Sequence, residues 1–195
     1  SRNAIWKAVK ALQEQGYAIE SLPSTGYRLR QKADILTRDA ICEALHVPLK
    51  LHLLDKVDST NNYAKTLSDL SLPQLVVSEE QTAGRGRLGR SFYSPAGKGI
   101  YMSFAFCPQL ELRQAMLVTT MTAVAVCRAL ESLTGLRPKI KWVNDIYLNE
   151  KKLCGILTEA ETNFETGEIQ KIIVGIGINC FEDAAMPPEL REVAT

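Results

Sequence analysis

The chain lacks an excess of either charge, and it lacks any pattern of metal or disulfide ligands. Its formal net charge is +1 over 195 residues, so binding to nucleic acid or to a membrane surface would have to come from local patches. The five cysteines include no C-x-x-C pair, and the two histidines lie apart from other ligand candidates. These absences argue against a zinc site or a disulfide framework, and they fit a cytoplasmic protein in a reducing compartment.

A long uninterrupted apolar run is also missing. The most apolar stretch, residues 115–130, contains threonines and Arg128, and it predicts a buried helix rather than a membrane span. No signal peptide is visible, and we expect no membrane partner. The chain opens without Met inside a helical pattern and stops in mid-pattern, so we expect a fragment truncated at both ends.

Residues 1–30 predict a helix followed by two short strands. Apolar residues recur at helical spacing through residues 2–15, and Gly16 can end that helix. Residues 17–19 and 26–29 have strand character around a turn. This order is that of the recognition helix and wing of a winged helix-turn-helix, although composition alone favours a solvated amphipathic helix. The face that could contact DNA carries Ser1, Arg2, Asn3, Trp6, Lys7 and Lys10.

The remaining residues predict a polar linker at 31–36 and one larger domain at 37–195. Helices are expected at 37–45, 60–70 and 114–133, and strands at 49–57, 75–80, 100–106, 139–142, 145–148, 153–161 and 169–178. The last three strands form a meander, and strands dominate the later part of the chain. This arrangement indicates an α+β fold with a mixed or antiparallel sheet rather than a doubly wound one.

Three glycines and three arginines fall within residues 84–90. Glycine lets the backbone approach a ligand closely, and consecutive backbone N–H groups can form a nest for an anion. Arginine adds a planar fork that suits phosphate and carboxylate oxygens. The loop therefore predicts a clamp for an anionic ligand such as a nucleotide phosphate, but a solvated basic loop or an RNA-contacting segment fits the spacing equally well.

Four further segments accompany this loop in a fixed order. They are Asp-Ser-Thr-Asn at 58–61, Lys-Trp-Val-Asn-Asp at 141–145, Lys-Leu-Cys-Gly-Ile at 152–156 and Gly-Ile-Gly-Ile-Asn at 175–179. Together the five segments resemble the biotin–protein ligase family, also called biotin–[acetyl-CoA-carboxylase] ligases. The opening residues further resemble the bifunctional members that repress biotin genes. The resemblance implies a class II synthetase-like catalytic domain preceded by a partial winged helix-turn-helix, with the family's small C-terminal β-domain missing.

The resemblance also implies a reaction in two steps. Biotin and ATP would give biotinyl-5′-AMP and pyrophosphate, with Mg²⁺ as the metal. A lysine on the biotin carboxyl carrier domain of acetyl-CoA carboxylase or a related carboxylase would then displace AMP. Operator DNA and a homodimer are the other partners expected of the full-length parent. Two alternatives remain: a lipoate–protein ligase with the same fold, and a ligand-sensing transcription factor without enzyme activity.

Two residues are expected to act in catalysis. By resemblance, Lys152 contacts the biotin carboxylate and the α-phosphate, where it would neutralise developing charge. Without its motif, Lys152 would be read as a solvated hairpin lysine. Arg87 matches the arginine that retains the reactive intermediate. Biotin contacts are expected from Ser59, Thr60, Asn61, Gln81, Arg85, Gly86, Arg87, Lys152, Gly175 and Gly177.

The chemistry of biotin suits several of these residues. A ureido ring has one acceptor and two N–H donors, which match hydroxyl and amide partners at 59–61, although a helix N-cap explains the same residues. Gly175 and Gly177 would let biotin approach the backbone, or would mark a β-bulge.

Nucleotide contacts follow from the same resemblance. Phe92 would cover the adenine, and the Asp145 carboxylate would contact Mg²⁺. Trp142 would be a pocket wall or part of the core, and core is the simpler interpretation. The expected ATP contacts are Arg85, Arg87, Arg90, Phe92, Asn144 and Asn179.

Overall fold

A computed structural model describes residues 2–14, 17–23, 25–31, 36–108, 112–163 and 165–191. The chain divides into two compact units, Ser1–Leu45 and His46–Thr195. The domain bounds proposed from the sequence, 1–30, 31–36 and 37–195, remain a prediction.

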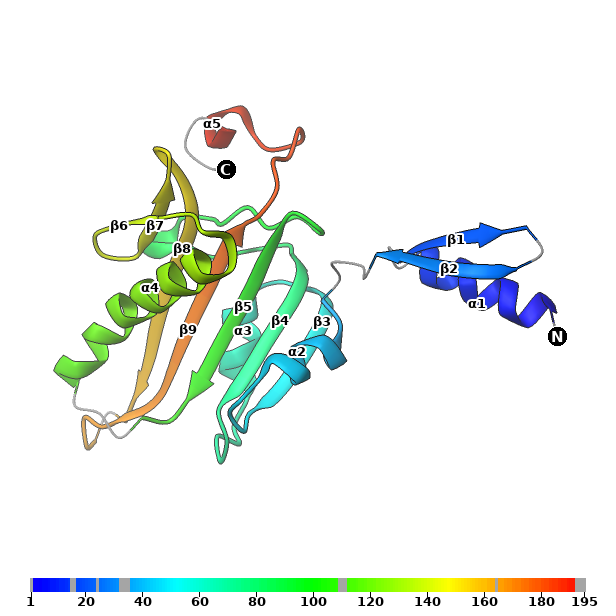
Figure 1. Cartoon of the computed structure of the whole chain (residues 1–195). Helices are drawn as coiled ribbons and strands as arrows, with labels where there is room; N and C mark the ends of the chain where they lie inside the picture. Colours follow the sequence, from blue (N-terminus) through cyan, green and yellow to red (C-terminus); the bar gives the residue numbers. More distant parts are fainter. Residues whose placement is uncertain are drawn as a thin grey trace. The chain divides into compact units, whose positions relative to one another are not determined.

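The first unit consists of a helix, a hairpin and a short helix (Figure 1). These are α1 (Arg2–Glu14), the antiparallel strands β1 (Ala18–Leu22) and β2 (Gly26–Gln31), and α2 (Arg38–Ala44). Helix and wing thus lie where the sequence predicts them. Thr37 caps α2, as expected, because its side chain accepts the backbone N–H of Ala40 at 3.2 Å.

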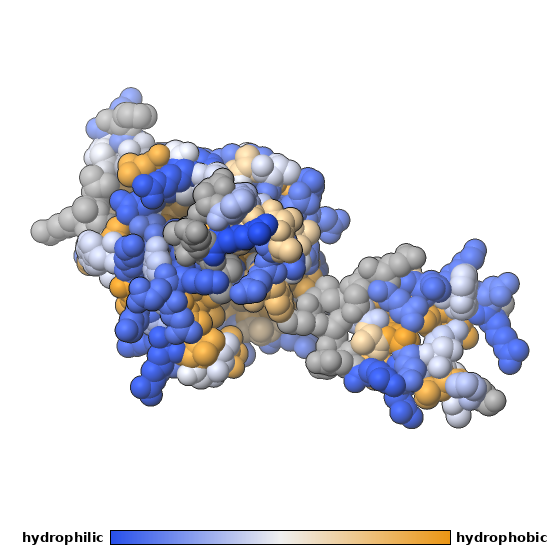
Figure 2. All heavy atoms as spheres, turned by 90° about the horizontal axis from the view of Figure 1, so that it is seen from above, coloured by the Kyte–Doolittle hydropathy of each residue, from blue (hydrophilic) through white to orange (hydrophobic). Residues whose placement is uncertain are grey.

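The exposed face of α1 carries the proposed DNA contacts. Arg2, Asn3, Lys7 and Lys10 are all exposed, whereas Ser1 and the expected helix stop at Gly16 lie outside the described residues. Apolar side chains also remain at the surface of this unit (Figure 2), among them Trp6 at 52% exposure. The ammonium of Lys10 lies 6.0 Å from the centre of the Trp6 ring.

The second unit is built on one mixed sheet of seven strands in the order β3-β4-β5-β9-β8-β7-β6 (Figure 1). Only β3 and β4 pair in parallel, and the other neighbours are antiparallel, as expected for the predicted α+β fold. The strands are β3 (Lys50–Val57), β4 (Gln74–Gln81), β5 (Gly99–Phe106), β6 (Lys139–Lys141), β7 (Asp145–Leu148), β8 (Lys151–Thr162) and β9 (Ile169–Asn179). The helices are α3 (Thr60–Thr66), η1 (Arg87–Gly89), α4 (Leu112–Thr134) and α5 (Pro188–Arg191).

Two apolar clusters cover opposite faces of this sheet. Along β9, Ile172, Val174, Ile176 and Ile178 join a cluster with α4, while Ile173 joins a cluster with α3. Because successive strand residues point to opposite faces, α3 and α4 lie on different sides. The odd-numbered positions 173, 175 and 177 therefore share the face of α3.

Helix α4 departs from the prediction of a buried helix. Ala123 and Val126 pack into the core, but only 11% of Leu117–Thr134 is buried, and Met121 is 67% exposed. This segment is long and apolar enough by length and composition to cross a membrane. Helix α4 is more exposed than predicted because the sheet covers only one side of it.

Candidate functional site

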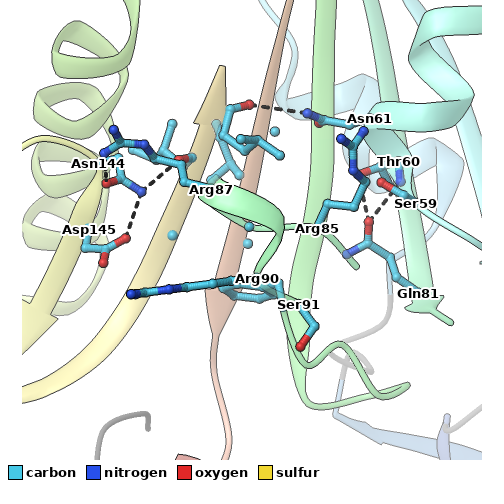
Figure 3. A pocket seen from close by; sticks show the side chains of 18 of the residues that line it. Ser59, Thr60, Asn61, Gln81, Arg85, Arg87, Arg90, Ser91, Asn144 and Asp145 are labelled. Carbon is cyan, nitrogen blue, oxygen red and sulfur yellow. Dashed lines mark hydrogen bonds between the residues drawn. The ribbon is translucent and has the colours of Figure 1, made fainter. Parts of the chain in front are cut away.

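One cavity of about 210 Å³ lies on the face of the sheet that carries α3 (Figure 3). It gathers residues from all five segments singled out in the sequence. The predicted residues that line it are Ser59, Thr60, Asn61, Gln81, Arg85, Gly86, Arg87, Arg90, Phe92, Asn144, Asp145, Lys152, Gly175 and Gly177. The structure thus brings together residues from α3, β7, β8, β9 and the segment 84–90, called the arginine loop below.

The floor of the cavity is the N-terminal turn of α3. Ser59, Thr60 and Asn61 are each 3% exposed or less. Ser59 is also the helix N-cap and accepts from the backbone N–H of Asn62, so the capping interpretation and the pocket interpretation both hold. Gln81 braces this turn, because its Oε1 accepts the Thr60 backbone N–H at 2.8 Å.

The two glycines of β9 make room for side chains. The pairing of β9 with β5 and β8 is continuous through Gly175 and Gly177, so neither marks a β-bulge. A Cβ at Gly175 would come to 2.2 Å from Asn61 Oδ1, and one at Gly177 to 2.5 Å from the Phe92 ring. The space that these glycines leave is therefore used by Asn61 and Phe92.

The arginine loop closes on itself over the cavity. The Gly86 N–H donates to Arg90 O at 2.7 Å, and the Arg90 N–H donates to Arg87 O at 3.1 Å. Between them, Leu88 has φ +55° and Gly89 has φ +74°. Since two of its amides bond within the loop, anion binding here depends on the arginine side chains more than on a backbone nest.

The arginines of the loop differ in their partners. Arg87 Nη1 donates to Asn144 Oδ1 at 2.8 Å, which ties the loop to the start of β7 (Figure 3). Arg85 Nη1 instead donates to Asn62 Oδ1 at 2.9 Å and lies 3.2 Å from a carboxylate oxygen of Glu159. Arg87 therefore extends across to the β7 side of the pocket, whereas Arg85 contacts side chains of α3 and β8.

Lys152 is held inside the site rather than solvated. Its Nζ lies 2.9 Å from Asp145 Oδ1, and its side chain is 28% exposed. The amide nitrogen of Asn144 donates to the same Asp145 oxygen at 3.0 Å and to Ile156 O at 3.1 Å. The lysine charge is thus placed at the wall of the cavity, paired with one carboxylate.

A metal ion would find few protein ligands in this wall. Within the described ranges, no group of three or more His, Cys, Asp or Glu residues could hold a metal. Asp145 supplies the one carboxylate among the residues that line the cavity. This set fits a Mg²⁺ that takes most of its ligands from substrate phosphates and water.

Two residues expected in or near the site lie elsewhere. Asn179 does not line the cavity, and its side-chain nitrogen donates to the carbonyl of Lys152 at 3.2 Å, so it braces that strand. Trp142 is 78% exposed and lines no part of the cavity, so both the core and the pocket-wall interpretations are wrong. It lies in the turn after the edge strand β6, where the sheet offers little to cover it.

Sequence reasoning missed two polar residues beneath the floor, one buried and one partly buried. Ser103 on β5 is fully buried, with its hydroxyl 2.6 Å from Asn61 Oδ1. Glu159 on β8 accepts from Asn61 Nδ2 at 2.9 Å. Neither belongs to one of the five segments, and a polar residue at an inward strand position was the one available signal.

The family model for biotin/lipoate A/B protein ligases matches residues 53–179, and an HTH domain model matches residues 1–28. The chain is 38% identical to the bifunctional ligase/repressor BirA of Bacillus subtilis (strain 168), over 100% of this chain and 61% of that protein. It is 32% identical to BirA of Escherichia coli (strain K12), over 92% of this chain and 55% of that protein.

A solved structure shows the same fold. The biotin protein ligase from Aquifex aeolicus in complex with biotin and ATP matches with a TM-score of 0.61 and 38% identity, over 75% of this chain and 58% of that one. The chain spans about 61% of the length of its Bacillus relative. On the family match and these identities, the chain belongs to the biotin/lipoate A/B protein ligase family.

Proposed function

We propose that the protein is a biotin–protein ligase that activates biotin with ATP and transfers it to a carrier lysine. One observation carries this proposal. A single cavity has a buried, hydrogen-bonding floor at Ser59, Thr60 and Asn61, and a wall that bears Arg87 and Lys152 (Figure 3). The floor suits a polar ring, and the wall suits the carboxylate and phosphate that must meet for adenylation.

In the first step, a carboxylate oxygen of biotin attacks the α-phosphorus of ATP and pyrophosphate leaves. Two anions approach each other, so the barrier falls if fixed positive charge faces them. Lys152 is the residue we assign to this role, and its 2.9 Å pair with Asp145 supports the assignment because the pair orients the ammonium at the wall. Arg90 and Phe92 complete the nucleotide side, with Phe92 against the adenine.

In the second step, the amine of a carrier lysine attacks the acyl carbon of biotinyl-5′-AMP and AMP leaves. Arg87 would hold the adenylate until the acceptor arrives. Its hydrogen bond to Asn144 supports this role, because it closes the loop toward β7. The acceptor we propose is the biotin carboxyl carrier domain of acetyl-CoA carboxylase or a related carboxylase.

Mg²⁺ would reach the site with ATP and use the Asp145 carboxylate as a protein ligand. Asn144 and Asn179 are both assigned as nucleotide contacts, but the structural support for the two assignments differs. Asn144 lines the cavity, whereas Asn179 would act through the backbone of Lys152. The reaction would take place in the cytoplasm, where the five free cysteines stay reduced.

A second function, repression of biotin genes, is favoured by the first unit. The HTH match at 1–28 and the exposed Arg2, Asn3, Lys7 and Lys10 of α1 support contact with operator DNA, with Ser1 beside them in sequence. A homodimer would let two such helices contact two half-sites.

The test is biotin-dependent exchange of labelled pyrophosphate into ATP, with lipoate as the competing substrate. Exchange with biotin supports the proposal. Exchange with lipoate alone would make the protein a lipoate ligase, and biotin binding without exchange would make it a ligand sensor.

A further inference from the structure

Glu159 lies beneath the floor of the cavity and joins segments that are far apart in sequence. On β8, Cys154 and Ile156 face the α4 cluster, so 155, 157 and 159 face the side of α3. The side chain of Glu159 is 22% exposed. Its Oε1 accepts from Lys65 Nζ at 2.8 Å, and its Oε2 accepts from Asn61 Nδ2 at 2.9 Å.

The carboxylate is charged in the folded protein. Burial raises the pKa of Glu159, but the hydrogen bonds from Lys65 and Asn61, together with the positive charges of Lys65 and Arg85, outweigh it and hold the pKa below its ordinary 4.5. At neutral pH both oxygens are therefore acceptors, and neither can donate.

These contacts fix the orientation of the Asn61 amide. Its nitrogen donates one hydrogen to Glu159 and the other to Leu157 O at 3.3 Å. Its oxygen accepts from the buried hydroxyl of Ser103 at 2.6 Å. An amide turned by 180° would set its oxygen against the Glu159 carboxylate and the Leu157 carbonyl, which are acceptors only.

Asn61 therefore offers the cavity one hydrogen-bond acceptor and no donor. Both N–H bonds of the amide are used below the floor, so what remains is the second lone pair of Oδ1. That oxygen lies beside Gly175, which lines the cavity. A ligand must present an N–H donor at this point to be bound well.

We propose that Glu159 is a positioning residue, which locks the Asn61 amide with its oxygen available and so selects ligands that present an N–H at the floor. The inference rests on the proposed function, in which that donor is a ureido N–H of biotin. Glu159 touches no ligand in this scheme. It acts through Asn61, beside its ion pair with Arg85, whose Nη1 lies 3.2 Å from Glu159 Oε1.

Glu159→Gln tests the lock. A glutamine places an NH₂ donor where one of the two carboxylate oxygens stood, so in this geometry it cannot accept from both Asn61 and Lys65, and the Asn61 amide can turn over. Biotin binding should weaken about tenfold, as expected for one lost hydrogen bond together with a mismatched donor. Equilibrium binding of biotin measures this effect without ATP.

Binding of methylated biotins distinguishes a turned Asn61 amide from a general loss of structure in the variant. Wild-type protein should reject biotin methylated at the ureido nitrogen that faces Asn61, so both singly N-methylated isomers are measured. Glu159→Gln should discriminate less against that isomer, because a turned Asn61 amide no longer requires the ureido N–H that methylation removes. A purely structural loss would weaken biotin and both isomers by the same factor.

Lys65→Met is the matched control, because it removes a partner of Glu159 but leaves the contact with Asn61. It should keep wild-type discrimination. Glu159→Asp keeps the charge but is shorter by one methylene, and it decides the question if the glutamine variant does not fold. Unchanged discrimination in every folded Glu159 variant overturns the inference. Wild-type protein that binds no biotin overturns the proposed function and the inference with it.

Discussion

The floor and the wall of the cavity differ in how much of their geometry is fixed before any ligand arrives. At the floor, Ser59 and Asn61 are almost fully buried and hydrogen-bonded from α3, β5 and β8. At the wall, Arg87 and Lys152 make polar contacts with side chains that a charged substrate could replace. The buried part is set by the fold, whereas the partly exposed part can rearrange around anions, because water can replace lost contacts there.

The largest effect should come from the charge at the wall. Lys152→Ala should slow adenylate formation by two or more orders of magnitude, about 3 kcal/mol on the barrier, because it removes the charge that we assign to the α-phosphate. Biotin-dependent pyrophosphate exchange measures this. Lys151→Ala is the control, since Lys151 lies 3.9 Å from the exposed Glu182 and should matter little. Near-normal exchange in the Lys152 variant would remove it from the mechanism.

Two glycine substitutions should show that the floor of the cavity binds biotin and the wall binds ATP. Gly175→Ala would push Asn61 aside and weaken biotin binding, whereas Gly177→Ala would displace Phe92 and weaken ATP binding. Overpacking of this kind costs about 1–3 kcal/mol, which is roughly 5- to 150-fold in affinity where it falls on binding. Calorimetric titration with each ligand measures both. If the two variants impair both ligands equally, the division into two functional regions is wrong.

Two of the three arginines of the loop, Arg85 and Arg87, should also differ. Arg87→Gly should release biotinyl-5′-AMP roughly tenfold or more faster, since a charge-assisted hydrogen bond contributes about 1.5–3 kcal/mol. Escaped adenylate would biotinylate bystander proteins that lack a carrier domain, and blotting for biotin detects them. Arg85→Gly should do this less, because Arg85 contacts Asn62 and Glu159. Adenylate made by the Arg87 variant but confined to the carrier would exclude a retaining role.

The smallest effect should be on stability against pH. Because the pKa of Glu159 is lowered in the folded protein, its contribution to stability is present above the ordinary pKa of 4.5 and is lost as the pH falls through the folded value. The urea midpoints of wild type and Glu159→Gln should therefore differ most above pH 4.5 and converge as the pH falls below it. A constant difference would mean that the carboxylate stays charged over this range.

The sequence predicted most elements of the fold from local patterns. Periodicity placed α1, the hairpin and the strands of the sheet within a few residues, and Thr37 was recognised as a cap. The helix predicted at 60–70 ends at Thr66, and α4 is more exposed than its composition suggests. In both cases tertiary packing decided the outcome, because a local pattern does not reveal which surfaces another element covers.

By itself, the sequence determined the five segments and their order, because hydroxyl, amide, arginine and lysine side chains have fixed chemical capacities wherever they lie. Only the tertiary structure decided which of these side chains bind one another. Asn61 and Glu159 are 98 residues apart, and Arg85 and Glu159 are 74 apart. Alternate residues of β8 and β9 reach the face of α3 only because the sheet runs β5-β9-β8. A hydrogen-bond partner supplied by a distant strand leaves no periodic signal in the sequence, so the lock beneath the floor is visible only in the folded chain.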